Sequence, residues 1–127
     1  MSIACYLSHP EVRIDPAVPV PQWGLSDVGR ARVAAFARGP WARRFTRIVS
    51  SDEVKAQETA RLIGDAIGVA VETGGNMGEN DRSATGFLPP DEFEQTADAF
   101  FARPDESVRG WERALDAQRR IVTAVRD

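Results

Sequence analysis

The 127-residue sequence contains one cysteine, one histidine and, among its 16 basic residues, one lysine. The single cysteine, Cys5, excludes an internal disulfide and a multi-cysteine metal site, and its position in an apolar run predicts that it is buried. The single histidine, His9, excludes a histidine-rich metal site. The composition therefore indicates a chain without disulfides, and we expect it to use no metal.

Long apolar runs and an excess of positive charge are also missing. The longest apolar runs, residues 3–7 and 33–37, are far shorter than the roughly 20 residues of a membrane-spanning helix, and no basic leader precedes a long apolar stretch. The net charge of -3 argues against a nucleic-acid binder held by a general positive field. We therefore expect a cytoplasmic protein with no nucleic-acid or membrane partner.

The residues that are present are typical of one globular domain over 1–127, with 43% hydrophobic and 28% charged side chains. Apolar and β-prone runs are predicted to be strands at 3–7, 47–50 and 69–71. Helical periodicity predicts helices from a Ser26 cap to Gly39, from the cap residues 50–52 to Gly68, around 93–101, and over 108–125. A long ordered loop is expected over 10–23. Strands that alternate with helices predict an α/β fold with a mainly parallel sheet.

The last expected helix reaches Asp127 without a glycine cap and without a following strand. In this fold class, a final helix normally leads to another strand of the sheet. We therefore expect the domain to lack its last strand or strands.

Two positions that could carry chemistry follow expected strands. His9 stands where the first expected strand ends, and ligands of open α/β sheets gather at the carboxyl ends of strands. An imidazole there can act as a base, nucleophile or ligand near neutral pH, or it can simply bind a backbone carbonyl. Lys55 lies in the first turn of a helix whose N–H groups and dipole attract anions. The alternative is an exposed lysine on a serine-capped helix.

Glu79 lies in the polar loop 74–90 that follows the third expected strand. A carboxyl group held partly out of water has a raised pKa and can donate a proton to a leaving oxygen. The alternative interpretation is an ordinary acidic loop.

Five segments occur in the order in which one family carries its motifs. They are residues 6–10 (YLSHP), 25–29 (LSDVG), 50–60 (SSDEVKAQETA), 77–79 (MGE) and 110–112 (GWE). With these segments the chain resembles the histidine phosphatase superfamily, the phosphoglycerate mutase-like proteins. The resemblance implies a three-layer α/β sandwich with a mainly parallel sheet, here apparently truncated at the C-terminus.

The resemblance also implies a mechanism without metal or cofactor. His9 attacks the phosphorus of a small phosphate ester in line and forms a phosphohistidine that water hydrolyses, while Glu79 protonates the leaving oxygen. Ser8 and Lys55 stand where the family has two phosphate-binding arginines. We expect Arg82, or alternatively Arg13, to compensate for the missing arginine.

The chain departs from the family pattern because it has Ser8 and Lys55 in place of arginines and lacks a second histidine. We therefore expect a phosphohydrolase of the histidine phosphatase type that binds a phosphorylated small molecule or phosphate ion, with weak or absent activity in this chain. The alternative is a non-catalytic member that binds an anion or a protein partner. A third interpretation is a fragment whose missing strand comes from a neighbouring chain, as in a homodimer.

Overall fold

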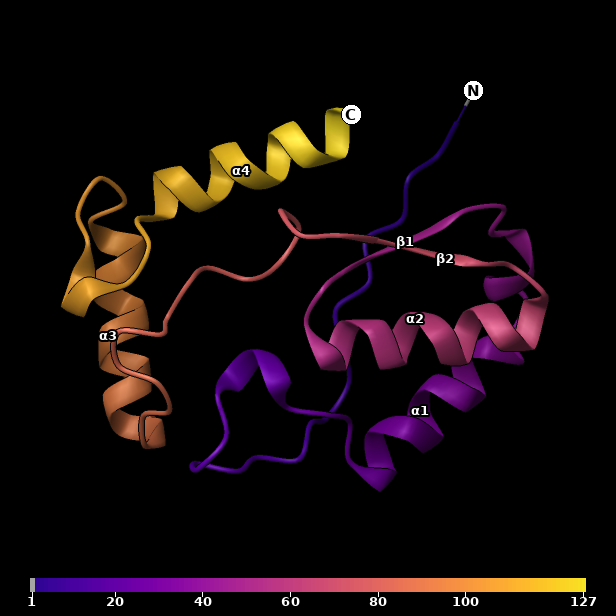
Figure 1. Cartoon of the computed structure of the whole chain (residues 1–127), viewed down its shortest axis with the longest axis horizontal. Coiled ribbons are helices and arrows are strands. Elements are labelled where there is room, and N and C mark those ends of the chain that lie inside the picture. The colour runs from indigo at the N-terminus through magenta and orange to yellow at the C-terminus, as the bar shows by residue number, and fades with distance from the viewer. Residues whose placement is uncertain (1) are drawn as a thin grey trace.

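The computed structural model describes residues 2–127, and Figure 1 shows their arrangement. The elements in chain order are the 3-10 helix η1 (Val20–Gln22), α1 (Asp27–Ala37), η2 (Ala42–Arg44), β1 (Ile48–Ser51), α2 (Val54–Ile67), β2 (Val71–Gly74), α3 (Pro90–Ala102), η3 (Val108–Gly110) and α4 (Ala114–Arg126). No helix among residues 2–127 is long and apolar enough to cross a membrane.

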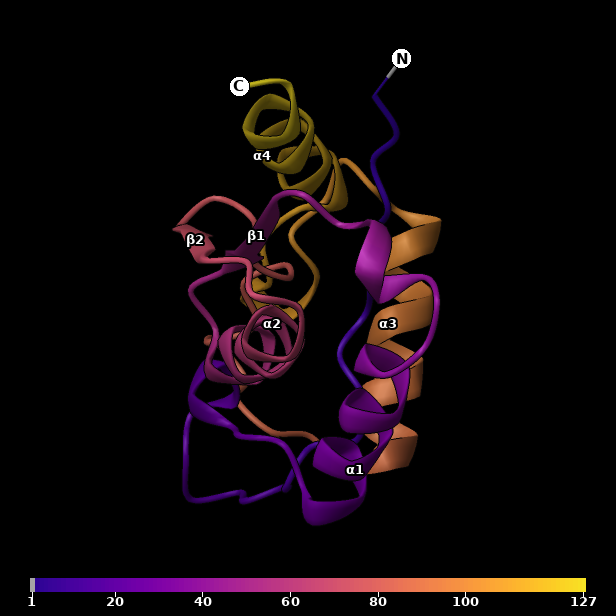
Figure 2. The same cartoon turned by 90° about the vertical axis from the view of Figure 1, so that its right-hand side faces the viewer.

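The two strands form a parallel sheet in which Ile48 lies opposite Val71 and Ser51 opposite Gly74. Helix α2 connects the strands and packs against the sheet, and α1 packs against α2 (Figures 1 and 2). Buried apolar residues of α1, α2, η2 and the segment before α1 form one core, which comprises Leu25, Val33, Ala37, Ala42 and Ile63. The strand, helix and strand predicted over this region are confirmed.

The ends of α1 and α2 follow from local chemistry. Ser26 is the N-cap of α1, as predicted, and its hydroxyl accepts a hydrogen bond of 3.0 Å from the backbone N–H of Gly29. Helix α2 ends at Gly68, whose φ of 76° is the left-handed conformation that glycine adopts without strain. The predicted cap residues 50–52 are wrong for α2, because Ser50 and Ser51 belong to β1 and the N-cap is Glu53.

The expected loop 10–23 is held in place by the indole of Trp23. Its N–H donates to the backbone carbonyls of Asp15 and Val18 at 3.0 and 2.9 Å. The only helical turn within this loop is η1.

A second, smaller core lies between α3 and the segment before α4. It comprises Leu88, Phe100 and Trp111. The helix predicted over 108–125 begins only at Ala114, because Val108–Gly110 forms a separate 3-10 turn in which Arg109 has a φ of 51°. Trp111 therefore packs in a connection rather than on a helix face.

The predicted first strand is wrong. Residues 3–7 pair with no strand among residues 2–127, and Ile3 and Tyr6 are 76% and 90% exposed. Cys5 is exposed as well, contrary to the prediction that it is buried. The apolar run is suited to an inner strand, but such a strand forms only where neighbouring strands satisfy its backbone N–H and C=O groups. The described sheet has two strands rather than three.

Candidate functional site

His9 precedes a segment that is fixed to the start of α1. The carbonyl of Glu11 accepts a hydrogen bond of 3.1 Å from the N–H of Ser26. At Gly29, a Cβ atom would lie 2.2 Å from the same carbonyl oxygen, so a side chain there would push the two segments apart. The contact of Glu11 with the start of α1, which needs a glycine at position 29, therefore fixes the position of the segment that follows His9.

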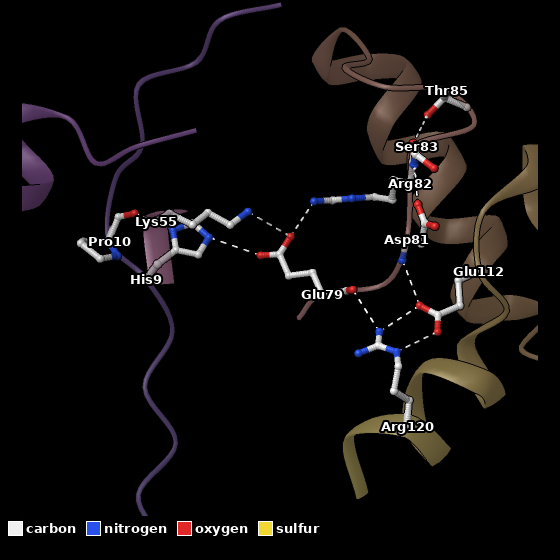
Figure 3. A network of polar contacts seen from close by, with 10 residues as sticks. All are labelled: His9, Pro10, Lys55, Glu79, Asp81, Arg82, Ser83, Thr85, Glu112 and Arg120. Carbon is white, nitrogen blue, oxygen red and sulfur yellow. Dashed lines mark hydrogen bonds and ion pairs between the residues drawn. The ribbon is translucent and has the colours of Figure 1, made fainter. Parts of the chain in front are cut away.

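The side chains of His9, Lys55 and Arg82 all contact the carboxylate of Glu79 (Figure 3). The Nε2 atom of His9 is 3.3 Å from Oε1, and the Nζ atom of Lys55 is 3.2 Å from Oε2. The Nη2 atom of Arg82 is 2.6 Å from Oε2. Three segments far apart in the sequence thus supply three nitrogen donors or cations to one carboxylate. This is the cluster that we call the Glu79 site.

Lys55 is almost completely buried, with a side-chain exposure of 3%, whereas 37% of the Glu79 side chain is exposed. The alternative of an exposed lysine is therefore wrong. A buried ammonium group is strongly disfavoured unless a negative charge compensates it, and Glu79 supplies that charge.

The pKa of Glu79 reflects opposing effects. Partial burial raises it, but the charges of Lys55 and Arg82, a hydrogen bond from Lys55 and the charge of His9 together outweigh burial and hold the pKa below its usual range. The expectation from the sequence that the pKa of Glu79 is raised is therefore wrong for the site without a bound anion. Glu79 is ionised at neutral pH when no other anion is bound.

The two nitrogens of His9 have different partners. Nδ1 lies 2.7 Å from the carbonyl oxygen of Pro10, which can only accept, so Nδ1 carries a proton. Nε2 faces Glu79. One nitrogen thus binds a backbone carbonyl and the other points toward Glu79, and a chemical role for His9 stays a prediction. In the neutral imidazole, the lone pair is on Nε2.

Arg82 is oriented by aromatic rings as well as by Glu79. The centre of its guanidinium lies 5.3 Å from the ring centroid of Phe93 and 5.9 Å from that of Trp111. Such cation–π contacts favour a defined position for the charge. The structure therefore brings Arg82 into the site, whereas Arg13 is exposed and is not among the partners of Glu79.

Ser8 is not part of the contacts around Glu79. It is exposed and borders a hollow of about 190 Å³ whose other lining residues are Leu7, Pro10, Arg32, Val33, Phe36, Thr59 and Ile63. Its expected role in phosphate binding stays a prediction. Within residues 2–127, no three His, Cys, Asp or Glu side chains are grouped so that they could hold a metal ion.

Arg120 and Glu112 lie behind the loop that carries Glu79 (Figure 3). The sequence placed Glu112 in a motif segment but gave it no role, and it gave no indication of Arg120. Arg120 donates to the carbonyl of Glu79 at 3.1 Å and to both carboxylate oxygens of Glu112. Glu112 precedes α4 and Arg120 lies within it, so no local spacing relates either residue to residue 79. No signal in the sequence could have identified the contact.

Comparison with solved structures defines the class of fold. A mycobacterial glucosyl-3-phosphoglycerate phosphatase in complex with inorganic phosphate has a TM-score of 0.71 and 24% identity, over 92% of this chain and 57% of that one. Mycobacterial hydrolase 2 has a TM-score of 0.74 and 23% identity, over 92% of this chain and 53% of the other. Mycobacterial hydrolase 1 has a TM-score of 0.68 and 25% identity, over 84% and 53%. This chain has the α/β fold of these proteins, and the expected fold class is confirmed.

The family follows from the sequence match. The family model of the histidine phosphatase superfamily, branch 1, matches residues 17–127, which is most of the chain. The chain therefore belongs to this superfamily, and the resemblance noted from the motifs is confirmed. Lys55 and Glu79 lie inside the matched region, and His9 lies before it. Comparison with curated protein sequences finds no significant match. The chain spans little more than half the length of these three solved structures, 53% to 57%.

Proposed function

We propose that this chain belongs to a phosphohydrolase that acts on a small phosphate ester through a phosphohistidine at His9. The observation that supports this most directly is the convergence of His9, Lys55 and Arg82 on the carboxylate of Glu79. A carboxylate offers two oxygens and a negative charge, and a phosphate group offers the same features with one more oxygen. The cations and N–H donors that surround a carboxylate are therefore chemically suited to surround a phosphate.

The proposed reaction has two displacements. In the first, the Nε2 lone pair of His9 forms a bond to phosphorus while the bond from phosphorus to the ester oxygen breaks, and that oxygen takes a proton from Glu79. In the second, water attacks phosphorus, the P–N bond breaks, and a proton of the water returns to Glu79. Lys55 and Arg82 offset the charge of the transferred group, and Ser8 is proposed as a further hydroxyl donor.

The proposed role of Glu79 requires a change in its protonation when substrate binds. In the structure its pKa is lowered chiefly by two cations, against the effect of burial. A bound phosphate would engage Lys55 and Arg82 and add negative charge beside Glu79. Both effects raise the pKa of Glu79, so the carboxyl group can carry a proton at the stage when it must donate one.

The substrate class is supported by the structural neighbours. One of them is a phosphatase with bound inorganic phosphate, although its identity to this chain is 24%. The activity of this chain is proposed to be weak or absent, because the sequence has Ser8 and Lys55 in place of two arginines and contains one histidine. The same features favour the alternative of a non-catalytic protein that binds a phosphate or another anion in this site.

The test is incubation with phosphoramidate, an activated phosphodonor. We expect an acid-labile, base-stable adduct on His9, the only imidazole of the chain, and no adduct in a His9→Asn variant. An adduct on a carboxylate or serine would contradict the mechanism. Binding of inorganic phosphate by calorimetry without any adduct would support the non-catalytic alternative instead.

A homodimer and a cytoplasmic location are further proposals. The exposed run 3–7 and the unpaired edge of the two-stranded sheet support pairing with a second chain. Sedimentation measurements that show only a monomer at micromolar concentration would contradict the dimer.

A further inference from the structure

The guanidinium group of Arg120 binds the backbone of the loop that carries Glu79. Nη1 donates to the carbonyls of Asn76 and Gly78 at 2.9 and 3.1 Å, and Nη2 donates to the carbonyl of Glu79 at 3.1 Å. The same group donates to both carboxylate oxygens of Glu112 at 3.0 and 2.9 Å. One rigid side chain therefore fixes three carbonyls within four consecutive residues.

Glu112 fixes the other side of Glu79. Its Oε2 accepts a hydrogen bond of 2.9 Å from the N–H of Asp81, and its own N–H donates to the carbonyl of Asp81 at 2.9 Å. Only 18% of the Glu112 side chain and 24% of the Arg120 side chain are exposed. The pair is thus shielded from water more than an ordinary surface ion pair, and it holds the chain both before and after Glu79 (Figure 3).

Apart from the contacts of Arg120 and Glu112, the loop is held through the side chains of Glu79 and Arg82. Residues 75–82 contain no helix or strand, and Gly75 and Gly78 add conformational freedom. An unrestrained loop of this kind loses the geometry of its side chains, because each ordered residue costs about 1–2 kcal/mol of backbone entropy. The contacts of Arg120 and Glu112 supply the restraint.

We propose that the Glu112–Arg120 pair is a positioning element that determines where the Glu79 carboxylate lies relative to His9, Lys55 and Arg82. Neither Glu112 nor Arg120 contacts the reacting groups, so they act only through Glu79. The consequence for catalysis rests on the proposed phosphohydrolase function. The claim that the pair positions Glu79 does not rest on that function, and it can be tested without any measurement of activity.

The experiment measures the pKa of Glu79 by carbon-13 NMR of its carboxyl group, with the signal assigned by its loss in Glu79→Gln. In Arg120→Gln and in Glu112→Gln, Glu79 should move away from Lys55 and Arg82, and its pKa should rise toward its usual value. The double variant should change the pKa no more than either single variant, since both changes break the same restraint. Arg113→Gln is the matched control, because the Arg113 side chain bonds to Asp116 and Asp105 rather than to the loop of Glu79, and it should leave the pKa unchanged.

Arg120→Lys is a second, milder variant that keeps the charge and a long side chain but cannot make the forked contacts. It should shift the pKa of Glu79 in the same direction, and it keeps the inference testable if Arg120→Gln does not fold. An unchanged pKa of Glu79 in folded Arg120→Lys, or in folded Arg120→Gln, would overturn the proposal.

A version of the protein that hydrolyses phosphate esters gives a second readout. There, Arg120→Lys should lower kcat by about 10- to 100-fold, because misplacing a reacting group by about 1 Å has an effect of that size, and it should change KM much less. An unchanged pKa of Glu79 in the folded variants would contradict the positioning role. Absence of phosphohistidine in the unmodified protein would contradict only the proposed function.

Discussion

The ammonium group of Lys55 and the carboxylate of Glu79 lie 3.2 Å apart and join the start of α2 to the loop after β2. Lys55 is 3% exposed, so its ammonium group is shielded from water and paired with this carboxylate. Under the proposed function, an incoming phosphate would compete with the Glu79 carboxylate for Lys55 and Arg82. Binding of phosphate therefore requires the two groups to separate or to share the new anion.

Replacing Lys55 should weaken the binding of anions. Lys55→Gln removes a charged hydrogen-bond donor worth about 1.5–3 kcal/mol, so we expect the affinity for inorganic phosphate to fall by about tenfold or more. Lys55→Arg, which restores a forked donor, should tighten binding by about 1 kcal/mol. Isothermal calorimetry with phosphate measures both. The control is Arg47→Gln, which breaks an exposed ion pair with Glu72 and should leave the affinity unchanged.

Glu79 should make stability depend on pH in a defined direction. Its pKa is lower in the folded chain than in the unfolded chain, where it is about 4.3. Its contribution is therefore fully present above that value and is lost as the pH falls through the lower, folded value. The difference in unfolding free energy between the wild type and Glu79→Gln, measured by urea denaturation, should be constant near neutral pH and shrink below about pH 4. A difference that grows on acidification would contradict the assignment.

The size of this difference at neutral pH should lie between those of exposed and buried pairs. Breaking a buried pair costs about 3–5 kcal/mol and an exposed pair at most about 1 kcal/mol. Because Lys55 is buried but Glu79 is partly exposed, we expect about 1–3 kcal/mol. Glu106→Gln, which breaks an exposed pair with Arg103, is the control and should have an effect below about 1 kcal/mol.

In a version of the protein that hydrolyses phosphate esters, Glu79→Gln should distinguish between leaving groups. A general acid contributes about 10²- to 10⁴-fold, and the need for it falls when the leaving group is stable as an anion. Hydrolysis of an alkyl phosphate should therefore decrease far more than hydrolysis of an aryl phosphate with an acidic phenol, as measured by steady-state kcat. Equal losses on both substrates would mean that Glu79 supports the pocket rather than donates a proton. Asp81 and Glu11 would then be the next candidates for the acid.

The aromatic rings beside Arg82 should contribute to anion binding through the position of its charge. Phe93→Leu keeps an apolar side chain but removes the ring that lies 5.3 Å from the guanidinium centre. A cation–π contact of about 0.5–1 kcal/mol corresponds to a two- to fivefold weaker affinity for phosphate. Phe101→Leu is the control, since this residue is 74% exposed and makes no such contact with Arg82. Equal affinities for wild type and Phe93→Leu would show that the Phe93 ring does not orient Arg82, which would leave that role to Glu79 and Trp111.

The sequence predicted the elements whose signals are local. The Ser26 cap of α1, the apolar face of α2 and its end at Gly68 depend on neighbours within a few residues, and all were confirmed. It also indicated His9, Lys55 and Glu79 as site residues, because each follows an expected strand. The structure brings these three together, and their chemical roles stay predictions.

Features that depend on distant partners could not be predicted in this way. The run 3–7 has the composition of an inner strand, but strand formation depends on hydrogen-bonded neighbours that the described chain does not place beside it. The pKa of Glu79 was expected to be raised by burial, and only the folded chain shows how close Lys55 and Arg82 come to it.

The sequence by itself determined the family, the strand–helix–strand unit and the types of residue in the site, because motifs, caps and apolar periodicity act over a few positions. Tertiary structure alone decided that Lys55 is buried against Glu79, that Arg82 rather than Arg13 joins them, and that Arg120 and Glu112 hold the loop from behind. These contacts join residues that are far apart in the sequence. Their strength depends on distance and exclusion of water, and both of these arise only when the chain has folded.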